Sequence, residues 1–279
     1  MKTLSIIGAG KVGKVFGRRL QQERQFTLTQ VLNRRLDSAQ RACEFIGADT
    51  QLACADEALL KPSDVWMLAV SDDQIASVCE KLQQQQLLNA DSIVFHCSGA
   101  KASTELSAAL ACGSAVASIH PVASFADPEQ VAQHFQGTIC SIEGEQRALD
   151  VLIPALNAIG ARVVEISADT KLLYHAGSVL ASNYLVTLLD TALRAYQAAG
   201  VPAELALAMA APLARQSMEN VFALGAAKAL TGPIARGDMH TVVKQQEVVQ
   251  QWDVKAGRVY EAFISPTQDL ALLKHHSEK

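Results

Sequence analysis

This 279-residue sequence has few aromatic residues, a small net charge and no long apolar run. Aromatic side chains make up 5% of it, and the formal net charge is −4. The basic residues form no long run or stripe, which disfavours a nucleic-acid partner. No uninterrupted apolar stretch reaches the ~18 residues that a membrane-spanning helix needs. We therefore expect no nucleic-acid and no membrane partner, and the few aromatic side chains offer no cage for a large ring.

Cysteine is present, but in no metal-binding or redox arrangement. Six cysteines are scattered along the chain, and no two of them form a CxxC pair. Such thiols are typical of a protein in which cysteines stay reduced and mostly buried. The first residues are themselves a predicted strand, so we expect no signal peptide. These observations predict a cytoplasmic protein without a zinc or other metal site.

The most informative motif lies at the start of the chain. An apolar strand, Thr3 to Ile7, runs directly into a glycine-rich turn, and a helical segment follows. This is the order of a dinucleotide-binding βαβ unit, in which the cofactor pyrophosphate lies at the helix N-terminus. A tight turn in an empty α/β domain is the alternative. The residues predicted to contact the cofactor here are Gly8, Ala9, Gly10, Lys11, Val12 and Gly13.

The residues after the second predicted strand, Phe26 to Leu32, lack the acid that is typical of NAD-binding proteins. A carboxylate there would bind the ribose 2′-hydroxyl of NAD and repel a 2′-phosphate. Instead Asn33 stands at this position, and Arg34 and Arg35 follow it. Guanidinium groups suit phosphate in geometry and in charge. We therefore predict NADP(H) rather than NAD(H), with a solvated arginine pair as the alternative.

Strand and helix signals alternate over residues 1–167. Apolar runs at 64–70, 92–97, 115–119, 138–142 and 162–166 predict further strands. This alternation predicts a Rossmann domain with a mostly parallel sheet, in which ligands bind beyond the carboxyl ends of the strands. We therefore expect the residues that follow the strands to gather at one edge, with Val70 and Ser71 at the cofactor. The others are Gly8, Ser98 and His120.

Only helical patterns follow residue 167, which predicts an all-α domain over 168–279. One helix is expected from Ser167, its N-cap, to about Ala199. Its middle, Val179 to Leu189, is apolar on most faces, as in helices that are buried between subunits. We therefore expect a homodimer built mainly on this domain. Further helices are predicted over 203–222, 241–263 and 267–273.

A Rossmann domain followed by a helical domain resembles the 6-phosphogluconate-dehydrogenase-like superfamily, which includes pyrroline-5-carboxylate reductase, ketopantoate reductase and prephenate dehydrogenase. Within it, the chain is most similar to a Rossmann-like family with a helical C-terminal domain of unknown function, whose members are often described as NADP-dependent oxidoreductases. The resemblance implies NADP and a dimer, but no substrate. Besides the glycine motif it rests on Ser118-Ile119-His120-Pro121, Tyr174-His175-Ala176, Ala181-Ser182-Asn183-Tyr184 and Thr231 to Asp238.

The resemblance also implies catalytic residues. Prephenate dehydrogenases carry a His-Pro pair at a strand end, whose histidine bonds the reacting hydroxyl, and a serine after the preceding strand. His120 and Ser98 match these two positions, although the glycine that usually follows the His-Pro pair is absent. The 3-hydroxyacid dehydrogenases and ketopantoate reductases of this superfamily use a lysine four residues before an asparagine on the first long helix. Asn183 matches this asparagine, but Val179 replaces the lysine, so another group donates the proton or the chemistry differs.

Two histidines are candidates for the proton transfer that accompanies hydride transfer, because histidine titrates near neutral pH. His120 lies at a strand end, and His175 lies on the long helix. On a regular helix His175 and Ser182 share a face, with Asn183 about a quarter turn away. This polar stripe predicts a site or a hydrogen-bonded interface. The alternative for either histidine is a structural role, which we expect for His96.

The segment Thr231 to Asp238 is the most distinctive part of the helical domain. Gly232-Pro233 predicts a turn, and Asp238 is expected to cap the next helix. Arg236 is predicted to bind a substrate carboxylate through its planar guanidinium. In the alternative, Asp238 is the anion that Arg236 binds, and the segment is a scaffold.

Together these features predict an NADP(H)-dependent oxidoreductase that transfers hydride to or from a small anionic carbonyl, hydroxyl or imine compound in the cleft between the domains. The predicted catalytic residues are His120, His175, Ser98 and Asn183, and the predicted substrate-binding residues are Ser182 and Arg236. The alternatives are a non-catalytic NADP-binding sensor or interaction protein and a deazaflavin-linked NADP reductase.

Overall fold

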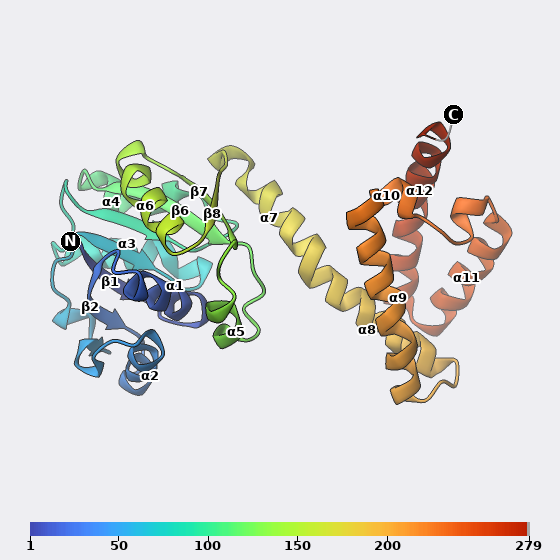
Figure 1. The fold of residues 1–279 in the computed structure, drawn as a ribbon, viewed down its shortest axis with the longest axis horizontal. Helices are drawn as coiled ribbons and strands as arrows, with labels where there is room; N and C mark the ends of the chain where they lie inside the picture. The colour runs from blue at the N-terminus through green and yellow to red at the C-terminus, as the bar shows by residue number, and fades with distance from the viewer. Residues whose placement is uncertain (278–279) are drawn as a thin grey trace. The chain divides into compact units, whose positions relative to one another are not determined.

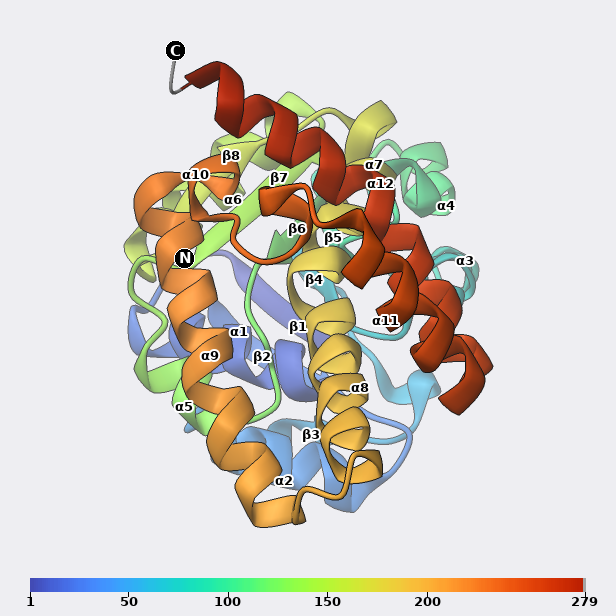
Figure 2. The ribbon, with the colours of Figure 1, turned by 90° about the vertical axis from the view of Figure 1, so that its right-hand side faces the viewer.

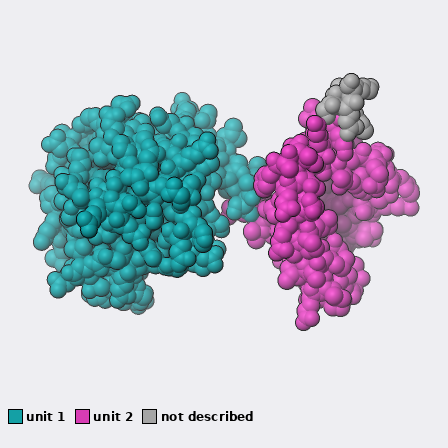
Figure 3. Space-filling view, viewed as in Figure 1, with its two compact units in different colours: residues 1–182 teal, residues 183–279 magenta. Residues whose placement is uncertain are grey.

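The computed structural model describes residues 1–277, which form two compact units (Figure 1). The first unit is Met1–Ser182 and the second is Asn183–Lys279 (Figure 3). The first unit thus continues past residue 167, where the strand and helix alternation ends. Its additional residues include the helix that begins at Lys171, which packs on the sheet through its first residue.

An eight-stranded sheet forms the centre of the first unit, in the order β3-β2-β1-β4-β5-β6-β7-β8. All neighbouring strands are parallel except β6 and β7, which are antiparallel. This confirms the predicted Rossmann domain with a mostly parallel sheet. The strands are β1 (Thr3–Ile7), β2 (Thr27–Leu32), β3 (Ala53–Cys54), β4 (Val65–Leu68), β5 (Ile93–His96), β6 (Ala115–Pro121), β7 (Ile139–Gly144) and β8 (Arg162–Glu165).

Two apolar clusters lie on opposite faces of this sheet. Side chains alternate along each strand, so Val65 and Met67 of β4 join one cluster while Trp66 and Leu68 join the other. Helices cover both faces, and β4 and β5 are buried along their whole length, as their continuous apolar runs predict. The helices of this unit are α1 (Lys11–Gln22), α2 (Leu36–Ile46), α3 (Ile75–Gln84), α4 (Ser107–Ala111), α5 (Pro128–Gln133), α6 (Gln146–Ala158) and α7 (Lys171–Val179).

The second unit consists of helices, as predicted. In it α8 packs beside α9, and α11 packs beside α12 (Figure 2). Its helices are α8 (Leu185–Ala198), α9 (Ala203–Leu224), α10 (Ala226–Ala229), α11 (Met239–Trp252) and α12 (Val254–Ser277).

The single helix expected over 241–263 is wrong, because the chain breaks at Asp253. The Asp253 carboxylate accepts hydrogen bonds from the backbone N–H groups of Lys255 and Ala256, at 2.8 and 3.1 Å, and so starts a new helix. The separate helix expected over 267–273 is wrong too, because α12 continues through Pro266 to Ser277.

The helix expected from residue 167 to residue 199 is not a regular α-helix. Ser167 caps a short 3₁₀ turn, Ala168–Thr170, by accepting a hydrogen bond from the Asp169 N–H. Between α7 and α8 the segment Leu180–Tyr184 is π-helical. A π turn contains an extra residue, so the helical phase shifts there. The alignment of His175 with Ser182 on a regular helix therefore does not hold, since Ser182 lies inside this turn.

The second unit buries few large apolar side chains. Its buried apolar residues are small, namely Ala206, Ala210, Val242, Ala256 and Ala271. Leucines, valines and Phe222 are instead exposed, Phe222 by 84%. Judged by length and composition alone, the helical run Ala168–Ala198 is long and apolar enough to cross a membrane. This differs from the expectation drawn from the sequence, which has no uninterrupted apolar stretch of about 18 residues.

Candidate functional site

The glycine-rich turn joins β1 to α1 at the carboxyl edge of the sheet. Gly8 has φ +83°, and a Cβ there would lie 2.7 Å from Val70 Cγ1. A Cβ at Gly13 would lie 2.9 Å from Ala69 Cβ, so this glycine lets α1 pack closely on the end of β4. In a dinucleotide-binding motif the first glycine permits the tight turn off the strand and the third lets the helix pack closely on the strand, and both contacts agree with these roles.

The space in front of Gly10 is open. A Cβ at Gly10 would meet only the Gly8 carbonyl oxygen, at 3.9 Å. No side chain caps the N-terminus of α1, and its first turn holds no acidic residue. The free N–H groups and the helix dipole there favour an anion. These residues fit the pyrophosphate of a dinucleotide. Ala9 is buried, and Lys11 Nζ donates a hydrogen bond to the Ala126 carbonyl oxygen at 3.2 Å.

The two predicted phosphate-binding arginines differ in their surroundings. Arg35 makes a bidentate ion pair with Asp37, with both N···O distances at 3.0 Å. Arg41 bonds the same carboxylate, and these hydrogen bonds hold the Asp37 pKa below its usual value. Arg34 is exposed, and no ion pair engages it within residues 1–277. Arg34 is therefore the free guanidinium beside Asn33, whose Nδ2 donates to Ser38 Oγ at 3.3 Å.

A histidine pair lies at the same edge of the sheet. His120 Nδ1 lies 3.0 Å from the Tyr174 hydroxyl, and its ring meets the His175 ring edge-on, with centroids 5.3 Å apart. His175 Nδ1 is buried and has no hydrogen-bond partner. A Cβ at Gly99 would overlap this nitrogen and lie 2.8 Å from His120 Nε2. Because Gly99 has no side chain, both imidazole rings can approach the same point beside it.

His120 is neutral at physiological pH. Burial, and then the nearby His175 and Lys171, lower its pKa to about 4, which Asp72 only partly opposes. A neutral imidazole can accept a proton, and the hydrogen bond between Nδ1 and Tyr174 leaves Nε2 available to a substrate. The geometry thus gives His120 the properties of a proton acceptor.

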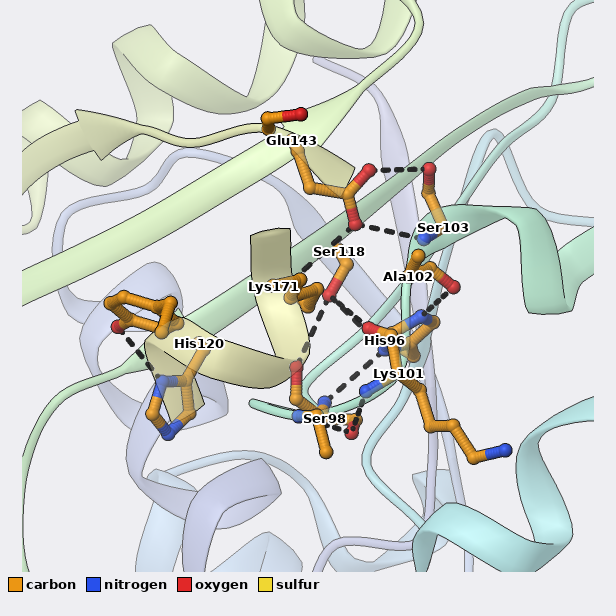
Figure 4. A network of polar contacts seen from close by, with 12 residues as sticks. His96, Ser98, Lys101, Ala102, Ser103, Ser118, His120, Glu143 and Lys171 are labelled. Carbon is orange, nitrogen blue, oxygen red and sulfur yellow. Dashed lines mark hydrogen bonds and ion pairs between the residues drawn. The ribbon is translucent and has the colours of Figure 1, made fainter. Parts of the chain in front are cut away.

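Ser98 is buried next to this pair, but its hydroxyl oxygen is already in use. Ser98 Oγ accepts hydrogen bonds from the N–H groups of Ala100 and Lys101, at 3.1 and 2.9 Å (Figure 4). These bonds shape the turn after β5. The neighbouring His96 is buried, with Nε2 3.0 Å from the Ala102 carbonyl oxygen and Nδ1 accepting from the Ser98 N–H, in agreement with a structural role.

The remaining predicted residues lie elsewhere in the chain. Ser182 and Asn183 are exposed in the π turn, and Asn183 and Arg236 belong to the second unit. Asp238 caps α11 by accepting a hydrogen bond from the Thr241 N–H at 3.2 Å, as expected. No hydrogen bond or ion pair joins Arg236 to Asp238 among the described residues, so Asp238 is not the bonded anion of that arginine. Val70 is half-buried and Ser71 exposed, both directly after β4.

Three residues of the cluster were not predicted from the sequence: Gly99, Tyr174 and Lys171. Lys171 and Tyr174 lie four and one positions before His175, so all three share one face of α7. That face is buried or half-buried, while Leu172 and Leu173 are exposed. The helical spacing could have shown that Tyr174 and Lys171 accompany His175. Their contact with β6 and β7 depends on tertiary structure alone.

Profiles of two domain families match consecutive parts of the chain. A Rossmann-like domain matches residues 2–121, and a domain of unknown function, DUF2520, matches residues 138–265. The chain is a Rossmann-like domain joined to a DUF2520 domain. This confirms the family resemblance drawn from the sequence. The DUF2520 match includes Tyr174 and His175, whereas Gly99 and His120 lie in the Rossmann-like match, so both domains contribute to the histidine cluster.

Solved structures share this fold across nearly the whole chain. Protein TM1727 from Thermotoga maritima is 24% identical, with a TM-score of 0.76, and the match covers 98% of this chain and 99% of that one. BF3122 from Bacteroides fragilis, provisionally named an NADP oxidoreductase, is 18% identical, with a TM-score of 0.77 and coverages of 96% and 98%. Prephenate dehydrogenase from Aquifex aeolicus, solved with hydroxyphenyl propionate and NAD+, is 15% identical, with a TM-score of 0.61 and coverages of 100% and 99%.

No curated protein matches the chain significantly. At these identities the solved structures show a common fold. NADP stands in the name of BF3122, a pyrroline carboxylate reductase from Plasmodium falciparum was solved with NADP bound, and the A. aeolicus prephenate dehydrogenase was solved with NAD+.

Proposed function

We propose that this protein is an NADP(H)-dependent oxidoreductase that transfers hydride to or from a small anionic carbonyl, hydroxyl or imine compound. One arrangement carries the proposal: an open glycine loop after β1 and a half-buried histidine pair beside β5 and β6 lie at the carboxyl edge of one mostly parallel sheet. Dinucleotide-binding sheets hold cofactor and substrate along that edge. Oxidoreductases among the proteins of the same fold support the assignment. The six free cysteines are consistent with a cytoplasmic location.

Each residue of the proposed site has a separate role in binding or proton transfer. When bound, the cofactor would supply or accept hydride at its nicotinamide ring. The N–H groups at the start of α1 bind the pyrophosphate, and Arg34 binds the 2′-phosphate. His120 Nε2 meets the substrate, and in the oxidative direction it takes the hydroxyl proton. His120 Nδ1–H donates to the Tyr174 hydroxyl oxygen in both directions, and in the reductive direction the protonated Nε2 of the imidazolium returns its proton to the substrate heteroatom. His175 Nδ1 provides a second polar contact.

Oxidation of NADPH in a panel of 2-keto acids, 3-keto acids and cyclic imines tests this proposal. We expect at least one class to be reduced, and the activity to fall at least about 100-fold in a His120→Asn variant. Tight NADPH binding without turnover of any compound would instead indicate a non-catalytic NADP-binding protein.

The preference for NADPH should depend on Arg34 more than on Arg35. Arg34→Ala should weaken NADPH binding about tenfold, since a charge-assisted hydrogen bond contributes roughly 1.5 kcal/mol or more. NADH binding should hardly change, because NADH has no 2′-phosphate. Calorimetric titration of the wild type and the variant with each cofactor measures both values. Arg35→Ala is the matched control, because Asp37 already pairs with that side chain. Equal losses in the two variants would contradict the assignment to Arg34.

We assign Arg236 to the substrate carboxylate, with Ser182 and Asn183 as further polar contacts from the chain between α7 and α8. Arg236 is exposed, and no ion pair engages it among the described residues. Arg236→Lys should raise the KM of an anionic substrate, because lysine lacks the planar fork, while the melting temperature changes little. A loss of stability with an unchanged KM would identify the segment as a scaffold.

We further propose a homodimer formed mainly through the helical unit. On α9, the exposed side chains of Leu205, Met209 and Leu213 recur every four residues and so form one apolar stripe. A second copy of the same unit offers a matching apolar surface. A membrane span by α9 fits less well, because Arg215 and Glu219 stand on that helix; the run with the length and composition for a span is Ala168–Ala198.

Light scattering at micromolar concentration tests the dimer. We expect twice the mass of the 29.8 kDa chain. Leu213→Asp should produce a monomer or an unstable protein, because the carboxylate would be buried without a partner. Glu219→Gln on the same helix is the control and should leave the dimer intact. A monomeric wild type would reject the proposal, and binding of the wild type to lipid vesicles would favour a membrane surface.

A further inference from the structure

A buried ion pair lies behind the histidine cluster. Lys171, the first residue of α7, places its Nζ 3.5 Å from Glu143 Oε1 on β7 (Figure 4). The two side chains are only 1% and 5% exposed. Lysine and glutamate are seldom buried to this extent unless they are paired.

The glutamate is held in place by other bonds. Its oxygens accept hydrogen bonds from the Ser103 N–H at 2.8 Å and from the Ser103 hydroxyl at 2.7 Å. Lys171 Nζ has no hydrogen-bond partner, so its charge is balanced mainly by Glu143. Removal of either charge alone would leave the other buried without compensation, which is strongly unfavourable.

The pair joins three segments that are distant in the sequence: the start of α7, β7 and the turn after β5. Tyr174 and His175 follow Lys171 by three and four residues and therefore lie on the same helical face. Because Lys171 is tied to the sheet, α7 cannot rotate freely about its axis. We propose that Lys171 is a positioning residue, whose ion pair with Glu143 holds Tyr174 and His175 against His120. This inference rests on the proposed function of His120.

The same ammonium also acts on His120 through its charge. A positive charge nearby disfavours protonation, so Lys171 helps to keep the imidazole neutral, together with burial and His175. Asp72, in the turn after β4, opposes this effect. Burial lowers the pKa of Lys171, and the charges of Glu143 and Asp72 oppose this effect; Cys97 also lies nearby, but burial raises the pKa of its thiol to about 12, so it stays neutral.

The experiment follows the His120 ring signals by NMR as pH is lowered, without cofactor or substrate. The signals are identified by their loss in His120→Asn. The test variants are Lys171→Met and the double variant Lys171→Met/Glu143→Gln, which removes both buried charges together and so protects the fold. Lys101→Met is the matched control, because Lys101 forms a more exposed ion pair with Glu105 in the same unit.

We expect the His120 pKa to rise by about one pH unit in both Lys171 variants and to stay unchanged in Lys101→Met. The His120 and His175 signals should also broaden or double, as α7 loses its fixed orientation. A folded double variant with the wild-type His120 titration and unchanged ring signals would overturn the proposal. NADPH affinity, measured in the same samples, is a separate readout, because loss of binding in the wild type would reject the proposed function without affecting the titration.

Discussion

Replacement of His120 by Asn should lower turnover about 10²- to 10⁴-fold, the usual contribution of a general acid or base. Asparagine can still form a hydrogen bond with the Tyr174 hydroxyl, but it cannot take a proton from the substrate. NADPH affinity should stay within about twofold, because no His120 atom is among those nearest to a Cβ at Gly8, Gly10 or Gly13. Steady-state kinetics and calorimetric titration of the same preparations measure the two effects. An unchanged turnover would remove His120 from the mechanism.

The pH profile gives an independent check on the same residue. Burial and the neighbouring positive groups lower the His120 pKa to about 4, so the imidazole remains a base well below the pH at which a free histidine is protonated. Turnover in the oxidative direction should therefore persist as pH falls from 7 to about 5 and decline only near pH 4. A decline centred near pH 6.5 would show that His120 is not buried as the structure has it.

Gly99→Ala should reduce turnover by about 100-fold, the effect of a displacement of roughly 1 Å in a catalytic group. The added Cβ would overlap His175 Nδ1 and lie 2.8 Å from His120 Nε2, so both rings must move. Overpacking of this kind also destabilises a folded protein, by about 1–3 kcal/mol. Kinetics and thermal unfolding of the variant measure the two losses.

Gly177→Ala is the matched control for this variant. Gly177 lies on the exposed side of α7, and a Cβ there would meet no atom within 4 Å. Alanine in place of a helical glycine stabilises by roughly 0.5–1 kcal/mol, so this variant should be slightly more stable and fully active. If Gly99→Ala behaves like Gly177→Ala, the two histidines do not converge on Gly99.

Much of the first unit could be predicted because its signals are local. Thr3–Ile7 is a strand with the predicted bounds, and the contacts of Gly8 and Gly13 are those that the motif predicts. The carboxyl ends of β1, β4, β5 and β6, with His120 near the end of β6, lie at one edge because these strands are adjacent and parallel. Hydrophobic periodicity and turn chemistry involve only residues near one another in the chain, so one sequence shows them.

The helical region was harder to predict at the same level of detail. The π turn at 180–184 alters the phase of a helix that periodicity shows as regular. Asp253 divides a predicted helix because its side chain caps the next one, although its neighbours continue the helical pattern. Such local choices of the backbone are decided by packing as well as by propensity.

The sequence by itself determined the Rossmann-like domain, the helical domain, the glycine loop and the absence of an acid after β2. These depend on residue type and spacing along the chain. Only the tertiary structure decided that Asp37 engages Arg35 and leaves Arg34 free, and that Gly99, Tyr174 and Lys171 surround the two histidines. Except for the short-range pair of Arg35 and Asp37, these contacts join residues far apart in the chain. They arise because buried polar groups must find partners wherever the fold brings such groups together.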